Sequence, residues 1–533
     1  MTPTRSRDAI KSLLGRYPQI AVTYQQWIAR DRHPSAGFDL NRLAGAVPAW
    51  ASILKTAAPA CDGKRVLLIG SLRWWIEYTT AMAVLLRAQG HGVDLAYLPH
   101  RRWTLPVSRF DAVRQSTLIR RTLAPLSEWI RYLDLSDGLA DQTPLELKEE
   151  ISIQSRLDVQ YTLQREDVDW DDGEAHDLLA LRLERNETAA SSAAALFAGN
   201  PYDVVIIPNG SILEFGAIYR VARHVGIPVI TFEFGEQRER MWLAQNAEVM
   251  RLDTSEVWAA RGGIPLTEKE DTAVKNLYHA RRGARLWKNF SRQWQAAESK
   301  GAREVREQLH LDPERPLALL CTNVVGDSLA LDRQVFTEGM EDWLTQTVRY
   351  FKGHPETQLV VRVHPGELLG AGHPSVDIVR TALPELPDHV IVVPPESKLN
   401  TYDLIELAQF GLVYTTTVGM EMAMAGLPVV VAGATHYRGK GFTHDPESLD
   451  AYFDTLGRLS AKAMESLLTE EQVNLAWRYA ERFFFEYPFP FPWHLVTFWE
   501  DLAERSMTQL ILENGCESYQ RTLDALIGEE IAW

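Results

Sequence analysis

Histidine and threonine side chains that suit phosphate binding follow two apolar runs in the second half of the chain. His364 and Pro365 end the strand-like part of VVRVHPGE, where an imidazole can donate a hydrogen bond to a phosphate oxygen. Thr415, Thr416 and Thr417 begin TTTVGMEMAMAG, at the point where an apolar run meets a helix-forming pattern. Backbone N–H groups and the helix dipole attract anions at such a junction. Each residue type also has a plainer explanation, because a lone histidine is often simply exposed and a threonine is a common helix cap.

Charged side chains lie close behind these segments. Gly419 and Glu421 follow the threonines, and a carboxylate near the start of a helix can accept hydrogen bonds from a ribose diol. A favourable interaction with the helix dipole explains Glu421 equally well. The segment HYRGKGFTHD, residues 436–445, carries Arg438 and Lys440 on a glycine-spaced loop suited to close approach to a diphosphate or a sugar carboxylate. This loop lacks the GxxxxGK[ST] spacing of a Walker motif.

Carboxylates after other apolar runs offer a second kind of chemistry. Glu233 and Glu236 lie in TFEFGEQRE, and Asp327 lies in LLCTNVVGDS. If the two halves of the chain face each other across a cleft, these groups can act as acid, base or nucleophile at a glycosyl centre. Taken singly, each is more simply explained as a surface carboxylate.

The elements that must position these residues alternate between strands and helices. KRVLLI at 64–69, a helical pattern at 74–89 and VDLAYL at 93–98 predict a βαβ unit of a parallel sheet, and 202–235 predicts another. Because ligands of open α/β sheets bind beyond the carboxyl ends of the strands, the residues named above follow strands where a ligand is expected. In the second half, strands are predicted at 317–323, 358–363, 389–393, 411–415 and 428–432.

The pattern predicts an α/β protein of two Rossmann-like domains. Residues 1–310 form the first, with a helical insertion at about 105–198, and residues 311–480 form the second. The two prolines of LDPERP mark the junction. Residues 481–533 are helical and aromatic-rich, and we expect their last helix to cross back to the first domain. A chain of 533 residues also exceeds the roughly 250 to 300 residues at which single cores stop growing.

Composition narrows the class of partner. The formal net charge of −16 disfavours nucleic acid, which needs a basic surface. Three scattered cysteines suggest neither a disulfide framework nor a zinc site. The first residues lack the uninterrupted apolar core of a signal peptide, and no stretch approaches the roughly 20 apolar residues of a membrane span. We therefore expect a cytoplasmic protein with at most peripheral membrane contact. LIGSLRWW has one glycine where a dinucleotide fingerprint needs three, which weighs against NAD.

The HP pair, the hydroxyl-rich loop about fifty residues later and HYRGKGFT together resemble the capsule polysaccharide biosynthesis family. That family includes bacterial Kdo transferases and, more distantly, the polysialyltransferases. The similarity is strongest over 317–445 and implies the GT-B fold of two Rossmann-like domains. It also implies that His364, Thr415, Thr416 and Arg438 contact the phosphate of a cytidine nucleotide.

The same resemblance implies catalytic roles. CTNVVGDS resembles the family motif that ends in a catalytic aspartate, which maps onto Asp327. The family's Glu-Asp-Gly motif resembles Glu233-Phe234-Gly235, although Phe234 stands where the family has an acid. HYRGKGFT also lacks the tryptophan common in the capsule enzymes. These departures leave the acceptor chemistry and the donor sugar open.

We therefore expect a glycosyltransferase that moves a sugar from a nucleotide-activated donor, such as a CMP-linked acidic sugar, to a surface polysaccharide or lipid-linked glycan. If the resemblance extends to mechanism, Asp327 would be the nucleophile and Glu233 the acid/base, and otherwise either could be the base of a single displacement. We expect no metal or other cofactor, since no compact acidic pair follows a strand. The donor would contact His364, the three threonines, Gly419, Glu421, Arg438 and Lys440. Two alternatives remain: a non-hydrolysing sugar-nucleotide 2-epimerase, and a non-catalytic scaffold for glycan assembly.

Overall fold

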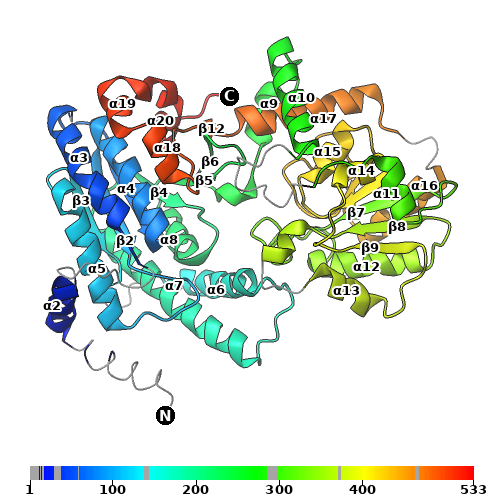
Figure 1. Cartoon of the computed structure of the whole chain (residues 1–533). Helices are drawn as coiled ribbons and strands as arrows, with labels where there is room; N and C mark the ends of the chain where they lie inside the picture. Colours follow the sequence, from blue (N-terminus) through cyan, green and yellow to red (C-terminus); the bar gives the residue numbers. More distant parts are fainter. Residues whose placement is uncertain are drawn as a thin grey trace. The chain divides into compact units, whose positions relative to one another are not determined.

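The computed structural model consists of two α/β units (Figure 1). It describes residues 17–28, 38–57, 59–136, 143–284, 297–369, 374–462 and 467–533, together with Lys11 and Leu14. Unit 1 comprises Met1–Asp158, Asp172–Val249 and Phe489–Ala532, and unit 2 comprises Val159–Asp171, Met250–Pro488 and Trp533.

Unit 1 is built on a seven-stranded sheet with the order β12-β6-β5-β4-β1-β2-β3. The strands from β5 to β3 run parallel, whereas β6 and β12 are antiparallel to their neighbours. Strands such as β4 (VVIIP) are continuous buried runs, as expected for a parallel sheet with helices on both faces. The strands are β1 Arg65–Ser71, β2 Gly92–Leu98, β3 Ile130–Asp134, β4 Val204–Pro208, β5 Val229–Phe234, β6 Arg240–Gln245 and β12 Phe489–Pro490.

The helices of unit 1 include the last ones of the chain. Phe489 on β12 pairs with Met241 on β6, so the C-terminal segment extends the sheet of unit 1 as well as packing on it. This confirms the predicted return of the C-terminal segment to the first domain. The helices are α2 Pro18–Ile28, α3 Asn41–Ala57, α4 Leu72–Ala88, α5 Arg109–Leu123, α6 Leu147–Leu163, α7 Gly173–Gly199, α8 Leu213–His224, α18 Phe498–Glu504, α19 Met507–Leu512 and α20 Gln520–Leu526; the part of α6 from Val159 onward belongs to unit 2.

Unit 2 has a five-stranded, wholly parallel sheet with the order β11-β10-β7-β8-β9. All five strands lie where the sequence predicts them. Helix α12 (Met340–Lys352) shows why such helices cover a sheet: its buried residues, among them Met340, Trp343, Leu344 and Phe351, recur every three or four positions and form one apolar face. The strands are β7 Leu317–Cys321, β8 Gln358–Arg362, β9 Val390–Val393, β10 Phe410–Val413 and β11 Val429–Val431.

The remaining helices of unit 2 precede, connect or follow these strands. The predicted α/β class with two Rossmann-like sheets is confirmed. No helix in the described ranges is long and apolar enough to cross a membrane. The helices are α9 Ser255–Arg261, α10 Glu268–Arg282, α11 Ala302–Gln308, α13 Ser375–Ala382, α14 Thr401–Ile405, α15 Val418–Met424, α16 Leu449–Lys462 and α17 Glu470–Glu481.

Two details differ from the sequence-based expectation. The predicted helical insertion at about 105–198 contains strand β3, which pairs in parallel with β2. β3 (IRYLD) is a partly exposed edge strand, so it lacks the apolar run that marks the central strands. The predicted junction lies near 310, whereas unit 2 already includes the chain from Met250 onward. Helix α10 packs on α17, with the Tyr278 and Trp477 rings 5.2 Å apart, and this contact explains the earlier boundary.

Candidate functional site

The carboxyl ends of three adjacent strands form one edge of the unit 2 sheet. Because β10, β7 and β8 are neighbours and run parallel, the loops after them share that edge. The loop after β7 is hydrogen-bonded to the loops after β8 and β10. Thr322 Oγ1 accepts a hydrogen bond from the His364 N–H at 2.9 Å, and Asn323 Oδ1 accepts one from the Thr415 N–H at 3.1 Å. The predicted histidine and threonine segments are therefore linked through residues that the sequence analysis did not single out.

His364 has a defined tautomer in this arrangement. Its Nδ1 accepts a hydrogen bond from the Gly366 N–H at 3.0 Å, so the neutral ring carries its proton on Nε2. A Cβ at Gly366 would lie 2.8 Å from that Nδ1, so a larger residue there would displace the imidazole. The result is an N–H donor at the edge where an anionic oxygen is expected.

The three threonines differ in what their side chains do. Thr415 is buried, and its hydroxyl donates to the Leu329 carbonyl at 2.8 Å. Thr416 and Thr417 are half-buried, and their hydroxyls make no hydrogen bond to any residue that the structure describes. Thr415 therefore fixes the loop, while Thr416 and Thr417 present hydroxyls at the edge.

Gly419 and Glu421 have roles within the fold. A Cβ at Gly419 would lie 2.4 Å from Tyr437 Oη, whose hydroxyl donates to the Thr416 carbonyl at 2.7 Å. Glu421 is 2% exposed, forms an ion pair with Arg281, and accepts a hydrogen bond from Tyr402 Oη at 2.9 Å. Gly419 thus allows close packing of Tyr437, and both oxygens of Glu421 are engaged by protein groups.

The two cations of the loop after β11, Arg438 and Lys440, also differ in what their side chains do. Arg438 donates to the Val431 and Pro446 carbonyls and pairs with Glu447 at 3.0 Å, so its guanidinium closes the loop on itself. Lys440 is half-buried, and burial lowers the pKa of its ammonium, although nearby Asp253 opposes the shift. Of the two cations, Lys440 is the one without a hydrogen-bonded carboxylate in the described part of the chain.

Asp327 is half-buried at the same edge, in the loop after β7. Its Oδ1 accepts a hydrogen bond from the Ser328 N–H at 2.7 Å, and burial raises the carboxyl pKa despite that bond and the charge of Arg333. The preceding Gly326 has φ +69°, and a Cβ there would lie 2.7 Å from backbone atoms of Gln164. The turn that presents Asp327 is therefore closely constrained.

Arg362, the last residue of β8, is a charged residue that the sequence analysis passed over. It is 4% exposed, and its guanidinium donates to the carbonyls of Pro394, Ser397 and Leu399 at 2.9, 3.4 and 3.5 Å. Burial lowers its pKa. The sequence does contain a signal for this residue, because an arginine stands inside the apolar run VVRV, two positions before the histidine.

Glu233 lies at the carboxyl end of β5 in unit 1. It is 8% exposed, Asn209 Nδ2 donates to its Oε2 at 3.0 Å, and the Phe234 N–H donates to its Oε1 at 3.1 Å. Burial raises the pKa of the carboxyl to about 7. The Phe234 ring packs edge-on against His494, 5.0 Å between centroids. Glu233 is thus a carboxyl whose acid and base forms are both available near neutral pH.

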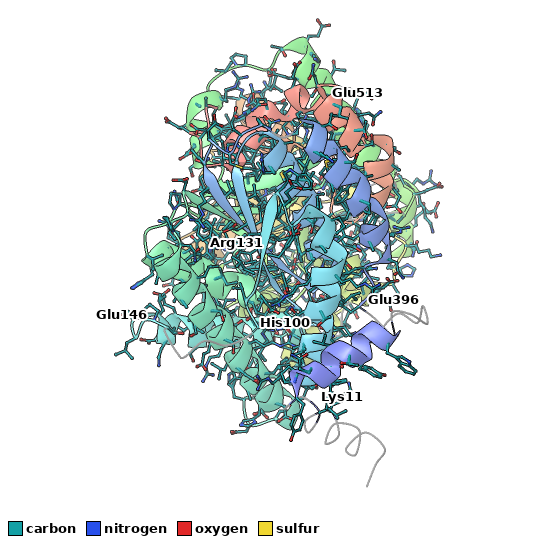
Figure 2. All side chains as sticks on the ribbon, turned by 90° about the vertical axis from the view of Figure 1, so that its left-hand side faces the viewer. Lys11, His100, Arg131, Glu146, Glu396 and Glu513 are labelled. Carbon is teal, nitrogen blue, oxygen red and sulfur yellow. The ribbon has the colours of Figure 1, made fainter. Side chains whose placement is uncertain are left out.

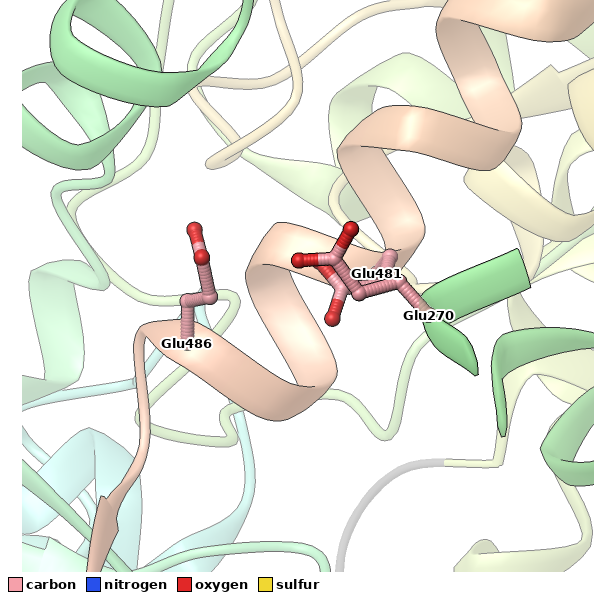
Figure 3. A group of neighbouring side chains, drawn as sticks. All are labelled: Glu270, Glu481 and Glu486. Carbon is pink, nitrogen blue, oxygen red and sulfur yellow. The ribbon is translucent and has the colours of Figure 1, made fainter. Parts of the chain in front are cut away.

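Unit 2 also contains a cluster of three glutamates whose charge is balanced by arginines. Glu270, Glu481 and Glu486 lie close enough together to share a cation (Figure 3). Arg482 Nη1 lies 3.0, 2.6 and 3.3 Å from oxygens of the three, and Arg261 also pairs with Glu486 at 2.8 Å. Two guanidinium groups therefore balance most of this charge, and we assign the cluster no ligand.

Comparison with known proteins gives fold-level similarity at most. No protein-family model matches the chain, and no curated protein matches it either. Among solved structures, the β-Kdo 2,4-transferase KpsC of Thermosulfurimonas dismutans is 16% identical, over 52% of this chain and 79% of that one, with a TM-score of 0.34. UDP-GlcNAc 2-epimerase from Neisseria meningitidis, bound to UDP-GlcNAc, is 12% identical, over 79% and 99%, with a TM-score of 0.26.

A second Thermosulfurimonas dismutans KpsC structure, the β-Kdo 2,7-transferase, is 14% identical, over 54% of this chain and 79% of that one, with a TM-score of 0.33. The chain is thus similar to transferase and epimerase structures alike. At these scores the similarity carries no argument about chemistry, which has to come from the side chains.

Proposed function

We propose that the protein is a glycosyltransferase of the GT-B type, which transfers a sugar from a nucleotide-activated donor to a glycan acceptor. The observation that supports this most directly is the carboxyl edge of the unit 2 sheet. There, Thr322 and Asn323 link the loop of His364 to the loop of the threonines. N–H and O–H donors gathered at one sheet edge suit the phosphate of a nucleotide sugar.

In this proposal the donor's phosphate is held by a smaller set of side chains than the sequence suggested. The Nε2–H of His364, the hydroxyls of Thr416 and Thr417 and the ammonium of Lys440 stabilise the negative charge that develops on the leaving nucleotide. The side chains of Thr415, Glu421 and Arg438 act indirectly, because their hydrogen bonds hold the loops in shape.

In this proposal two carboxyl groups act as catalytic residues. Glu233, with its pKa raised by burial to about 7, moves the proton of the acceptor hydroxyl as acid/base. In a reaction through a covalent intermediate, Asp327 attacks the anomeric carbon as the nucleotide phosphate leaves, and the acceptor oxygen then displaces Asp327 while Glu233 takes its proton. In a single displacement the acceptor oxygen attacks the anomeric carbon directly as the nucleotide leaves, and either Glu233 or Asp327 takes the proton. The proposal invokes no metal, since hydrogen-bond donors and Lys440 serve the leaving group. A CMP-linked acidic sugar is the donor that the HP and threonine motifs suggest.

A nucleotide-dependent thermal shift tests the donor site. A ligand that binds only the folded state raises Tm, by an amount set by RT ln(1 + [L]/Kd). With CMP present at about a hundred times its Kd, we expect roughly 2.7 kcal/mol of stabilisation, lost in His364→Ala. UDP, GDP, TDP and ADP are screened beside CMP.

The matched control for His364 is His354→Ala. His354 lies before strand β8, at its amino end, and contacts Tyr350, so its loss should leave the nucleotide shift intact. A shift that survives His364→Ala, or that both variants abolish equally, would contradict the proposed site. A shift with UDP or GDP alone would keep the transferase and change the donor.

Acceptor dependence separates the proposal from the epimerase alternative. A transferase releases nucleotide in proportion to acceptor glycan, whereas an epimerase converts the nucleotide sugar with no acceptor present. Mass spectrometry of the sugar nucleotide after incubation alone distinguishes the two. A chain that binds no nucleotide would favour the scaffold.

A further inference from the structure

Two helices of unit 1 begin where the strand order of its sheet reverses. Strands β2 and β3 follow β1 on one side, whereas β4 and β5 lie on the other. Helix α4 begins directly after β1, and α8 begins a few residues after β4, so both helix N-termini lie at the carboxyl edge of this sheet (Figure 1). Ligands of open α/β sheets bind at such a reversal of strand order.

Protein groups already occupy the N-terminus of α8. Asp158 Oδ1 accepts a hydrogen bond from the N–H of Leu213, the first residue of the helix, at 2.6 Å. Glu214 lies in the first turn, is 2% exposed, and pairs with Arg182 at 3.3 Å. Two carboxyl groups of the chain therefore lie at the positive end of this helix dipole.

The N-termini of α5 and α7 are also closed by protein side chains. At α5, the Ser108 hydroxyl accepts a hydrogen bond from the Asp111 N–H at 3.2 Å, and Asp111 pairs with Lys11, which is labelled in Figure 2. At α7, Asp172 accepts one from the Glu174 N–H at 3.0 Å. The N-cap residue thus does its usual work in both helices.

The N-terminus of α4 lacks any such group. Its N-cap is Ser71, with an extended backbone, yet the Ser71 side chain accepts no N–H of the first turn, and no acidic residue lies in that turn. An N-cap side chain with this backbone lies beside the free N–H groups of the first turn. Ser71 is 2% exposed, and its Oγ has no hydrogen-bond partner in the described part of the chain. A buried hydroxyl without a partner is costly unless a ligand or a water completes it.

A cation stands in the same turn. Arg73, the second residue of α4, is exposed and forms no ion pair with any residue that the structure describes. Its charge acts on Glu77, but that carboxyl is 3% exposed and accepts a hydrogen bond from Trp499 Nε1 at 3.1 Å. A positive side chain opposes the helix dipole at this end, unless an anion lies between them. Trp74 is 38% exposed, so the turn is open to solvent.

We propose that the N-terminus of α4 binds an oxyanion, the carboxylate or phosphate of an anionic sugar. The first-turn N–H groups and the Ser71 hydroxyl donate hydrogen bonds to its oxygens, and the Arg73 guanidinium neutralises its charge. Anion binding would satisfy the Ser71 hydroxyl and remove the conflict between Arg73 and the helix dipole.

The proposed acid/base Glu233 lies at the same edge of the sheet. Asn209, the residue after β4, donates a hydrogen bond to Glu233, and α4 packs on β5 through the rings of Trp75 and Phe232, 5.6 Å apart. We therefore identify the anionic sugar with the acceptor. This identification rests on the proposed function, whereas the anion site itself does not.

Three sugars test the site on the full chain: methyl glucoside, which is neutral, methyl glucuronide, which carries a carboxylate, and glucose-6-phosphate. Thermal shifts are measured at constant ionic strength in a His364→Ala background, so that the proposed nucleotide site contributes little. We expect one anionic sugar to bind at least about tenfold more tightly than methyl glucoside. The better of the two anionic sugars shows whether the group is a carboxylate or a phosphate.

Two variants should weaken that binding. Arg73→Gln and Ser71→Ala should each raise the Kd of the preferred anionic sugar about fivefold or more. Ser71→Ala should not lower Tm without ligand, because the hydroxyl that it removes has no protein partner. The matched control is Arg109→Gln: Arg109 is the exposed first residue of α5, whose N-terminus Ser108 already caps, so its loss should leave Kd unchanged.

Three results would overturn the anion site: anionic sugars that bind no more tightly than methyl glucoside, a Kd that Arg73→Gln leaves unchanged, or an equal loss in Arg109→Gln. The nucleotide shift of the parent protein is measured beside these titrations. If nucleotide gives no shift while the anionic sugar binds, the proposed transferase fails and the anion site stands. If nucleotide binds and the anionic sugar does not, only the anion site fails.

Discussion

At the scale of single residues, Glu233 links stability to pH. Its carboxyl pKa is raised from an ordinary 4.5 to about 7, so between these pH values the folded state holds a proton that the unfolded state has released. Stability from this group is therefore greatest at or below about pH 4.5, falls as pH rises to 7, and then levels off.

Replacing Glu233 with glutamine removes this dependence. We expect Glu233→Gln to be more stable than the parent at pH 8 by up to about 3 kcal/mol, and nearly equal to it at pH 4.5. Urea unfolding at several pH values measures the difference. Glu166 and Glu481 also have pKa values raised to about 7, but they are present in both proteins and cancel in the comparison.

The same variant should transfer no sugar, while the thermal shift with nucleotide in unit 2 persists. A variant as active as the parent would remove Glu233 from the mechanism. A difference in stability that does not change between pH 4.5 and 8 would show that its carboxyl titrates normally.

Residue types and spacing predicted which loops carry polar groups, but not which of those groups face a ligand. His364, Thr416 and Thr417 present donors at the sheet edge. Glu421 on α15 and Arg438 in the loop after β11 were predicted beside them, yet their partners are Arg281, Tyr402, Glu447 and two carbonyls. Arg281 lies 140 positions before Glu421 in the chain, and nothing local to Glu421 signals such a partner.

At the scale of elements, the pair of Arg281 and Glu421 joins α10 to α15. Both side chains are at most 3% exposed. A buried ion pair that loses one member leaves the other charge unpaired, which costs about 3 to 5 kcal/mol. We expect Arg281→Met to lose that much stability in urea unfolding, and Arg281→Met/Glu421→Gln to regain most of it.

The double variant is the informative member of this series. If it is as unstable as the single one, the loss comes from packing of the Arg281 side chain against Phe484, 5.1 Å from its guanidinium, and the charge argument is wrong.

Sequence patterns predicted every strand of unit 2 and the central strands of unit 1, but not the outer strands of unit 1. Every strand of unit 2, including the partly buried β9, is apolar enough to be recognised. In unit 1, β3, β6 and β12 went unrecognised, and all three lie in the outer part of their sheet. β12 has only two residues, one of them proline, and its pairing with β6 depends on residues about 250 positions apart, which periodicity cannot detect.

At the scale of the whole molecule, the chain returns from unit 2 to unit 1 at residue 489. Phe491 is fully buried in unit 1, where its ring lies 6.0 Å from that of Tyr78. Phe491→Ala should cost about 3 to 5 kcal/mol. Hydrogen exchange should then speed up in unit 1 peptides such as 65–98 and 204–245, but not in 317–431, because protection follows the unit that is destabilised.

Phe351→Ala is the reciprocal control. Phe351 is fully buried in the core of unit 2, so its loss should speed exchange in 317–431 and spare unit 1. If either substitution loosens both units to the same degree, the two sheets unfold as one cooperative body.

The pairing of β12 with β6 also sets an order of events on the ribosome. Strand β6 ends at Gln245, and its partner is not made until residues 489–490. At the usual 5 to 20 residues per second, the intervening chain takes on the order of ten to fifty seconds to synthesise. During that time unit 1 has an unpaired strand edge while unit 2 is being made. We expect a nascent chain at this stage to engage ribosome-associated chaperones until its last segment emerges.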